Sequence, residues 1–325
     1  MPSNQSPLGA LPARFRRERV LIIGCGDVGM RVVRAQAALH PTAGHARVRM
    51  LALTSSPARV SDLRAAGVVP LQGNLDQPQT LQRLAGLATR ILHLAPPQLQ
   101  GHQDQRTRAL LRALMRRQSA RAMVYASTSG VYGDCQGEWV DESRPVAPRN
   151  PRAHRRVDAE QAVAFWGRAR HSRTSVLRVP GIYAPDREGG TPYERIARGS
   201  PILLAQDDVF TNHIHADDLA RACMLALWRG HARRTYHISD DSAMKMGDYY
   251  SAAAALYGLP TPPRMSRQEA QTQLSPMQMS FMGESRRLRN QRMKRELRLR
   301  LRYAQVLDGL QADQRMPMRT SPKID

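Results

Sequence analysis

Cysteine and long apolar runs are scarce in this chain of 325 residues. Its three cysteines, Cys25, Cys135 and Cys223, lie far apart and form no Cys-x-x-Cys pair, which indicates neither a disulfide framework nor a zinc site. No apolar run approaches the roughly 20 residues that span a bilayer. The first nineteen residues contain four arginines but no apolar core of signal-peptide length. We therefore expect a cytoplasmic protein with no membrane segment and no metal site.

Lysine is also rare, although the formal net charge is +22. Three of the 49 basic residues are lysine, and the arginines are spread over the whole chain. A charge of this size is typical of proteins that bind polyanions. The even spread of arginine favours a codon preference of the genome over a nucleic-acid-binding patch.

One basic stretch, Arg286 to Tyr303, holds nine basic residues and one acid. Leu297, Leu299 and Leu301 recur there with a period of two, which suggests a half-buried strand or the extended end of a helix. We interpret the stretch as part of a substrate lobe with a solvated basic face. The alternative is an anion site for a phosphorylated substrate or a nucleic acid, and that alternative lacks the interleaved aromatic residues of single-strand binders.

A glycine-rich turn near the N-terminus dominates the motifs. The apolar run Val20–Ile23 predicts a buried strand, and it is followed by Gly24-x-Gly26-x-x-Gly29 and a helical pattern. Gly24 permits the tight turn, Gly26 lets the backbone approach a pyrophosphate, and Gly29 lets the helix pack on the strand. The helix N-terminus offers N–H groups to the phosphates. The motif predicts a dinucleotide site, against the alternative of a turn without a ligand.

Apolar runs alternate with helical patterns through the first 180 residues. Strands are expected at Val20–Ile23, Val48–Leu53, Val68–Leu71, Arg90–Leu94, Ala122–Ala126 and Ser175–Val179. Helices are expected at 28–39, 57–66, 78–87, 104–118 and 151–169. This alternation predicts an α/β fold, a doubly wound parallel (Rossmann) sheet with helices on both faces.

After Pro180 the elements become shorter and prolines interrupt them. We expect a smaller C-terminal substrate lobe that covers the carboxyl ends of the strands, where α/β sheets bind ligands. The expected organisation is a flexible N-terminal arm over residues 1–18, the dinucleotide-binding Rossmann domain over 19–180, the lobe over 181–312, interleaved with the end of the sheet, and a flexible tail over 313–325.

Four further segments carry a family resemblance. They are VYASTSGVYGD at 124–134, LRVPGIYAPDR at 177–187, HIHADDLA at 213–220 and YHISDD at 236–241. With the glycine-rich turn, their order and spacing over about residues 19–310 resemble the extended or atypical short-chain dehydrogenases, the NAD-dependent epimerase/dehydratase group. The resemblance implies an NAD(P)-binding oxidoreductase.

The cofactor site implied by the resemblance comprises the turn and the ends of the next strands. Its residues are Gly24, Gly26, Asp27, Val28, Gly29, Thr54, Ser55, Arg59, Asp76, Ala95, Pro96 and Arg156. The second strand ends at Thr54-Ser55 with no carboxylate to select NAD, and Arg59 follows. We therefore expect NADP to be preferred over NAD, the alternative being that Arg59 is a solvated first-turn residue. The resemblance puts Asp76 near the adenine, and capping of the helix at Pro78 is an equal alternative.

The catalytic residues of the family are a hydroxyl residue, a tyrosine, and a lysine four residues after that tyrosine. Thr128 matches the hydroxyl, but Arg152 and Arg156 stand where the tyrosine and lysine are expected. Arginine can donate to ribose hydroxyls but cannot shuttle protons, because its pKa lies above about 12. The candidate catalytic residues are therefore Thr128, Tyr132 and Arg156, with a structural role as the alternative for Tyr132.

Three hypotheses follow. The first is an epimerase/dehydratase-like oxidoreductase with a non-standard active site, acting on a small-molecule substrate that the sequence does not identify. The second is a non-catalytic NAD(P)-binding sensor or scaffold on the same fold. The third is an Arg-rich nucleic-acid binder. Proteins of this fold often dimerise through helices that flank the sheet, so the resemblance also implies a homodimer.

Overall fold

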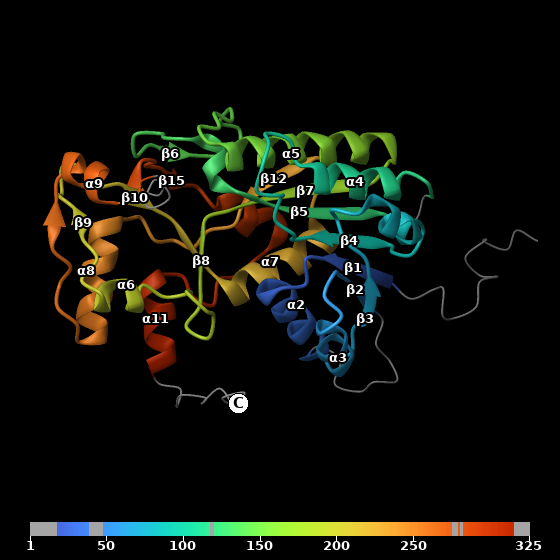
Figure 1. The fold of residues 1–325 in the computed structure, drawn as a ribbon, viewed down its shortest axis with the longest axis horizontal. Coiled ribbons are helices and arrows are strands. Elements are labelled where there is room, and N and C mark those ends of the chain that lie inside the picture. Colours follow the sequence, from blue (N-terminus) through green and yellow to red (C-terminus); the bar gives the residue numbers. More distant parts are fainter. Residues whose placement is uncertain (1–17, 39–47, 118–119, 275–278, 280–281, 315–325) are drawn as a thin grey trace, which may run out of the picture.

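The strand that precedes the glycine-rich turn lies inside a seven-stranded parallel sheet. A computed structural model describes residues 18–38, 48–117, 120–274, 279 and 282–314 of the chain (Figure 1). The sheet order is β12-β7-β5-β4-β1-β2-β3. Its strands are β1 (Glu18–Ile23), β2 (Val48–Thr54), β3 (Val69–Gln72), β4 (Arg90–His93), β5 (Ala122–Thr128), β7 (Arg173–Val179) and β12 (Arg234–His237). All strands expected before residue 180 are confirmed.

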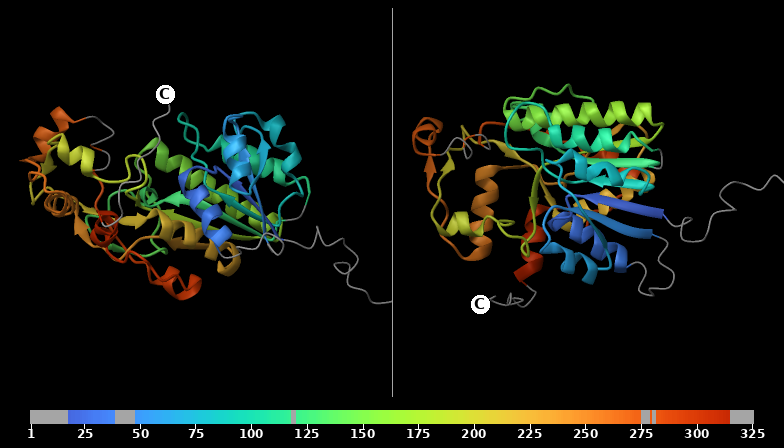
Figure 2. Two further views of the ribbon diagram at one scale, coloured as in Figure 1. Left: turned by 90° about the horizontal axis from the view of Figure 1, so that it is seen from below. Right: turned by 45° about the vertical axis from the view of Figure 1, so that its right-hand side comes forward.

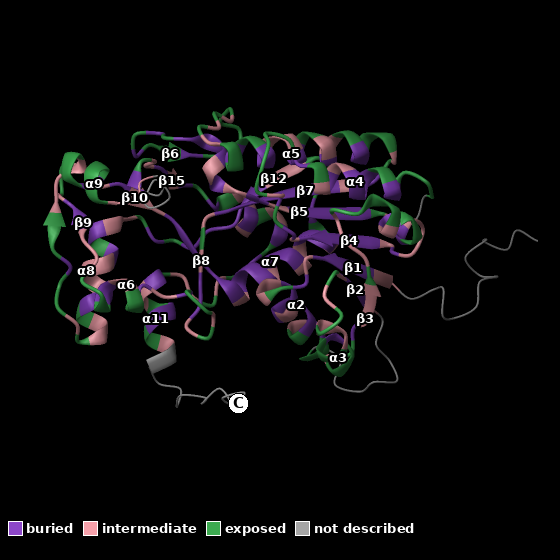
Figure 3. Cartoon of the chain, viewed as in Figure 1, coloured by how far each residue is buried: buried purple, intermediate pink, exposed green. Residues whose placement is uncertain are grey.

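Helices cover both faces of the sheet, as the alternation predicts (Figure 2). One face carries α2 (Asp27–Ala38), α3 (Arg59–Ala65) and α7 (Ala216–Arg229). The other carries the 3₁₀ helix η2 (Pro78–Leu84), α4 (Gln105–Leu114) and α5 (Pro151–Ala169). Alternate residues of β1 point to opposite faces, so Val20 and Ile22 pack in one core and Leu21 and Ile23 in the other. This two-sided burial explains the continuous apolar run, and Figure 3 shows the buried central strands.

A smaller lobe lies beyond the carboxyl ends of the strands (Figure 1). Its helices are α6 (Tyr193–Ala197), α8 (Met246–Tyr257), α9 (Arg267–Gln273) and α11 (Val306–Gln314). Short strand pairs join its loops: β8 (Gly181–Tyr183) with β11 (His213–His215), β9 (Ile202–Leu203) with β14 (Arg264–Met265), β10 (Phe210–Thr211) with β13 (Met244–Lys245), and β6 (Trp139–Val140) with β15 (Arg287–Leu288). Two short helical turns complete the elements: η3 (Ser129–Tyr132) and the π-helical turn η4 (Met293–Leu297).

The chain returns from the smaller lobe to the main sheet after residue 180. β12 pairs with β7 as the last strand of the main sheet, and α7 packs against α2. Residue 18 already belongs to β1, and α11 extends to residue 314. The rest of the expected arm and tail, 1–17 and 315–325, lies outside the described residues. Within the described part of the chain, no helix has the length and apolarity that a membrane crossing requires.

The basic stretch differs from its predicted place in the substrate lobe. Met293, Leu297 and Leu299 are buried in the same core as Val20 and Ile22 of the Rossmann sheet. The leucines therefore cover the sheet face beside α7, and the intervening basic side chains turn outward. The period of two predicted half-burial, and the buried side of the stretch packs in the core between the sheet and α7.

Candidate functional site

The glycine-rich turn has the geometry of a phosphate-binding loop. Gly24 adopts φ +84°, and a Cβ there would lie 2.5 Å from the backbone nitrogen of Ala95, so the turn requires glycine. A Cβ on Gly29 would lie 3.2 Å from the Cys25 Sγ, which explains the close packing of α2 on β1. A Cβ on Gly26 would meet no atom within 4 Å. The backbone at Gly26 therefore faces open space at the N-terminus of α2.

An ion cluster that the sequence reading missed closes one side of this turn. Arg31 is 5% exposed and pairs with Asp27 at 3.1 Å, Asp186 at 2.5 Å and Asp217 at 2.6 Å. Arg187 also reaches Asp27, with 3.2 Å between Nη1 and Oδ2. The cluster ties the loop after β8 and the start of α7 to the first turn of α2. Asp27 thus has two arginine partners that offset its charge at the glycine-rich turn.

No carboxylate stands at the end of β2, and an arginine, Arg59, begins the helix that follows. Thr54 is half-buried, Ser55 is exposed, and both line a cavity of about 650 Å³ with Asn74 and Gln77. Burial raises the pKa of the Cys25 thiol to about 11, and the charge of Arg59, the first residue of α3, opposes that rise. Within the described residues, no carboxylate pairs with Arg59.

Asp76 does not cap the helix that begins at Pro78. The N-cap residue is Gln77, and no side chain caps that helix. Asp76 instead holds Arg106 through a two-bonded ion pair, with 2.7 Å to Nε and 2.6 Å to Nη2. This hydrogen bonding lowers the pKa of Asp76. The capping alternative is therefore wrong, and the pair links the loop after β3 to α4.

The loop after β4 contains Ala95 and Pro96 and lies against the glycine-rich turn. Ala95 N donates to the Ile23 carbonyl at 3.0 Å, which fixes the contact between this loop and Gly24. Beneath it, buried His93 shares a 2.8 Å hydrogen bond with the Thr107 hydroxyl, which donates to Asp104 at 2.7 Å. Burial lowers the pKa of His93 to about 3, so the ring is neutral. No spacing in the sequence indicates this network.

Thr128 lies at the wall of a large pocket between the sheet and the lobe. The pocket has a volume of about 700 Å³ and extends from the end of β5 to the start of α5 and the loop around Asn212. The Thr128 hydroxyl accepts a 3.2 Å hydrogen bond from Gly130 N. The Glu284 carboxylate comes from the far C-terminal segment. A Cβ built on Gly130 would lie 4.0 Å from Glu284 Oε2 and 3.6 Å from Thr128 Oγ1. A carboxylate and a hydroxyl therefore flank the same point of the pocket wall.

Tyr132 is buried and is not among the residues that line this pocket. It is 2% exposed, and its hydroxyl accepts from Arg178 Nη1 at 2.6 Å and lies 2.6 Å from His237 Nε2. Arg178 also pairs with buried Glu160 at 2.7 Å. Burial raises the pKa of Tyr132 to about 12, against the lowering effect of Arg178. Tyr132 thus belongs to a buried structural network, the alternative that the sequence left open.

A Tyr132→Phe variant separates the two roles. Because the phenylalanine leaves Arg178 and His237 without their shared partner, we expect the free energy of unfolding to fall by roughly 1–3 kcal/mol. Dinucleotide affinity should stay unchanged, since the hydroxyl is remote from the pocket. Urea unfolding and a fluorescence titration measure the two effects. Normal stability combined with lost activity would restore the catalytic role.

Arg152 and Arg156, which the family resemblance aligns with a tyrosine and a lysine, have different surroundings. Arg156 is 9% exposed, and its Nη1 donates to the Ala126 carbonyl at 2.9 Å and the Tyr125 hydroxyl at 3.0 Å. Arg152 lines the pocket near Thr128. Arg156 is therefore anchored beneath the end of β5, whereas Arg152 faces the space in which a substrate would lie.

The rings of His213 and His215 both pack against tyrosine rings. His213 stacks on Tyr249 with 4.4 Å between ring centroids, and burial lowers its pKa to about 4. His215 Nδ1 accepts from Asp217 N at 3.1 Å and caps α7. Among the described residues, no three His, Cys, Asp or Glu side chains are grouped to hold a metal ion. All three cysteines are free and buried.

Several side chains of the basic stretch have partners within the protein. Arg286 pairs with Glu284, Arg292 lies 3.5 Å from Glu142, and Lys294 lies 2.5 Å from Asp241. Arg287 lies over the rings of Trp139 and Phe210. These contacts use several of the charges to hold the C-terminal segment in place.

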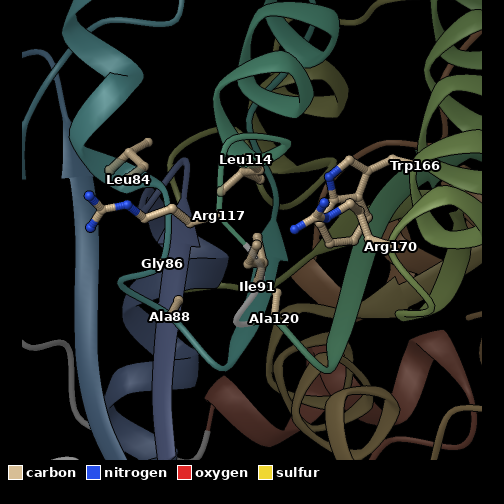
Figure 4. A pocket seen from close by; sticks show the side chains of 9 residues that line it. All are labelled: Leu84, Gly86, Ala88, Ile91, Leu114, Arg117, Ala120, Trp166 and Arg170. Atoms are coloured by element: carbon tan, nitrogen blue, oxygen red, sulfur yellow. The ribbon is translucent and has the colours of Figure 1, made fainter.

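A further hollow lies at the opposite edge of the sheet, where β4 and β5 begin (Figure 4). Ile91, Leu114 and Trp166 line it, and its volume is about 10 Å³. That volume holds one water molecule at most. The hollow is a packing defect in the core and does not compete with the pocket at the carboxyl ends of the strands.

A sequence model of the NAD dependent epimerase/dehydratase family matches residues 42–239, more than half of the chain. The chain belongs to this family. The match ends at the YHISDD segment and includes three of the four resembling segments completely. The epimerase/dehydratase fold and its Rossmann sheet thus agree with the sequence prediction.

Solved structures of this family's fold superpose over most of the chain. A conserved protein of unknown function from Silicibacter pomeroyi DSS is 29% identical, with a TM-score of 0.73, over 91% of this chain and 97% of that one. A dTDP-glucose 4,6-dehydratase from Streptomyces venezuelae with NAD bound is 20% identical, with a TM-score of 0.71, over 90% and 95%. A UDP-glucose 4-epimerase from Thermotoga maritima with UDP-glucose is 16% identical, with a TM-score of 0.71, over 90% and 96%. At 16–20% identity the last two show the fold alone.

One curated relative is a Methanocaldococcus jannaschii protein provisionally named UDP-glucose 4-epimerase. It is 25% identical over 126 residues, which are 36% of this chain. The match spans 41% of that relative, less than half of its length. The activity of the whole relative is therefore not carried over to this protein.

Proposed function

We propose that the protein binds a nicotinamide dinucleotide along the carboxyl edge of the sheet and acts as an oxidoreductase of the epimerase/dehydratase type. The observation that carries the proposal is the open backbone at Gly26, with no atom within 4 Å of its Cβ position, at the N-terminus of α2. Gly24, Asp27, Val28 and Gly29 complete the phosphate cradle. Ala95, which lies against Gly24, and Pro96 would belong to the same cofactor site.

We further propose that NADP is preferred over NAD. Thr54 and Ser55 end β2 without a carboxylate that would repel a 2′-phosphate. Arg59 begins α3, the helix after β2, and no carboxylate among the described residues forms an ion pair with it. A phosphate held by an arginine forms a strong charge-assisted hydrogen bond. Asp76, tied to Arg106, would form the adenine side of the site.

The NADP preference predicts a selective effect of Arg59→Glu. We expect NADP affinity to fall about 10–100-fold, because a charged hydrogen bond of about 1.5–3 kcal/mol is lost. NAD affinity should change much less. Fluorescence titration with both reduced nucleotides measures the ratio, and Arg64→Glu in the same helix is the control. Equal losses for both nucleotides would contradict the preference.

The proposed chemistry does without the usual tyrosine and lysine. The bound nicotinamide would supply or accept hydride. The Thr128 hydroxyl would orient the substrate oxygen, and Arg156, anchored to Ala126, would donate to the cofactor ribose. Where an alcohol is oxidised, the proton of its hydroxyl needs an acceptor, and the Glu284 carboxylate, which also pairs with Arg286, would take it. Monitoring nicotinamide absorbance with a panel of carbonyl and sugar substrates tests this function.

A second candidate is a sensor or scaffold that holds the cofactor without turnover. Two observations favour it: arginines occupy the tyrosine and lysine positions, and the Tyr132 hydroxyl is engaged in the core. Cofactor binding with no turnover for any substrate supports the sensor. For the nucleic-acid hypothesis, duplex binding with a steep salt dependence is the test.

The homodimer also stays a proposal. The outer face of α4 and α5 carries exposed Phe165, at 62%, and Met115, at 39%. Both line a shallow cavity of about 460 Å³ together with Leu111 and Ala162. A second copy of this face would cover these apolar side chains.

A further inference from the structure

The pocket of Thr128 has a strong excess of positive charge. Its described lining residues include four arginines, Arg152, Arg155, Arg187 and Arg286, and one carboxylate, Glu284. Two of the arginines already have acidic partners, since Arg286 pairs with Glu284 and Arg187 with Asp27. The unbalanced charge therefore lies on the first turns of α5, with Arg152 and Arg155.

Arg152 is the cation without a partner. Within the described residues, no hydrogen bond or ion pair engages its guanidinium. Desolvation lowers the pKa of Arg152, and the positive charges of Arg156 and Arg155 lower it further. Three positive side chains therefore repel one another at one end of the helix. An anion bound between them would relieve this repulsion.

Arg155 supplies a second, independent indication of a ligand. It is 6% exposed, and its Nη1 donates to the Gly101 carbonyl at 2.6 Å. Its Nε is buried with no hydrogen-bond partner. A buried charged donor left unpaired costs free energy, and Arg155 is among the residues that line the pocket at the N-terminus of the 19-residue helix α5. A helix N-terminus also favours negative charge.

We propose that the substrate carries a compact oxyanion, a carboxylate or a phosphate group, bound by Arg152 and Arg155 at the N-terminus of α5. This inference rests on the proposed function, because it assigns a substrate class to the same pocket. The anion would lie beside Thr128, at the reacting end of the substrate. Arg152 thus replaces a proton-transferring tyrosine with an anion-binding group, and the substrate is an anionic alcohol or carbonyl compound.

The test titrates the protein, saturated with NADP, with malonate, inorganic phosphate and uncharged glycerol. With NADP bound, the proposed phosphate site at the glycine-rich turn is occupied, so the added anions cannot bind there. We expect one of the two anions to bind and glycerol not to bind, and the tighter anion identifies the carboxylate or the phosphate class. Arg152→Gln should weaken that binding about tenfold or more. Arg168→Gln, near the far end of the same helix, should leave it unchanged.

Equal weakening by both variants, no effect of Arg152→Gln, or equal binding of glycerol would overturn the inference. Repeating the anion titration without NADP separates the two proposals. If the nucleotide does not bind but Arg152-dependent anion binding persists, the proposed function fails and the anion site stands. If the nucleotide binds and both anions are ignored, only the anion site fails.

Discussion

Replacing Gly26 with valine is expected to abolish dinucleotide binding while the protein stays folded. A valine at Gly26 meets no atom of the free protein within 4 Å of its Cβ, so the fold tolerates it. The same side chain fills the space in which the backbone would meet the pyrophosphate. We expect a loss of affinity of at least about 100-fold, which corresponds to about 2.7 kcal/mol. A fluorescence titration with NADPH, together with thermal unfolding, measures both properties.

Gly24→Ala is the informative contrast. Its Cβ would lie 2.5 Å from the Ala95 nitrogen, and the residue has φ +84°. This variant should lose stability as well as binding, whereas Gly26→Val should lose binding alone. If Gly26→Val binds NADPH as the wild type does, the pyrophosphate does not lie at this turn.

Removing the Glu160 carboxylate is expected to give the largest loss of stability. Arg178 is 7% exposed, and Glu160 is its acidic partner, with a bond of 2.7 Å between Nη2 and Oε2. Glu160→Ala leaves this guanidinium buried without a counter-charge, which costs roughly 3–5 kcal/mol. The hydroxyl of Tyr132 cannot compensate, because it is neutral. Urea denaturation measures the free energy of unfolding.

The matched control is Glu138→Ala, which breaks the pair between Glu138 and Arg144. Those side chains are 60% and 41% exposed, so solvent already screens the pair. We expect a change of less than about 1 kcal/mol. A similarly small change for Glu160→Ala would show that the network around Tyr132 does not stabilise the core.

Local patterns were sufficient to predict the Rossmann sheet. The apolar run of β1 and the spacing of Gly24, Gly26 and Gly29 depend on neighbours within about ten residues. The structures that these patterns predict, a buried strand and a tight turn, are formed by the same neighbouring residues. The same holds for α5, whose N-cap Asn150 accepts from Ala153 N at 2.9 Å.

Pairings between distant segments could not be predicted in this way. Arg31 and Asp217 are 186 residues apart, and Glu284 reaches Gly130 from the other end of the chain. The basic stretch showed its half-buried period, but only the tertiary fold shows that Leu297 packs on the Rossmann core. Tyr132 was ambiguous for the same reason, since the partners of its hydroxyl, Arg178 and His237, lie far along the sequence.

The pocket combines both kinds of information. Motif alignment predicts a role for Thr128 and for two arginines of α5, and α5 itself contains no tyrosine or lysine. The excess of charge becomes visible only when Arg155, Arg187 and Arg286 meet Arg152 around one cavity. The spacing of these arginines in the sequence does not predict that they line one cavity, because the fold brings them together.

Calorimetric titration of the pure, folded protein with NADP and with NAD tests the central claim most directly. The account predicts saturable heat with at least one of the two, at one nucleotide per chain, and tighter binding of NADP. Absence of heat with both nucleotides in excess, in protein shown to be folded by circular dichroism, would contradict the account.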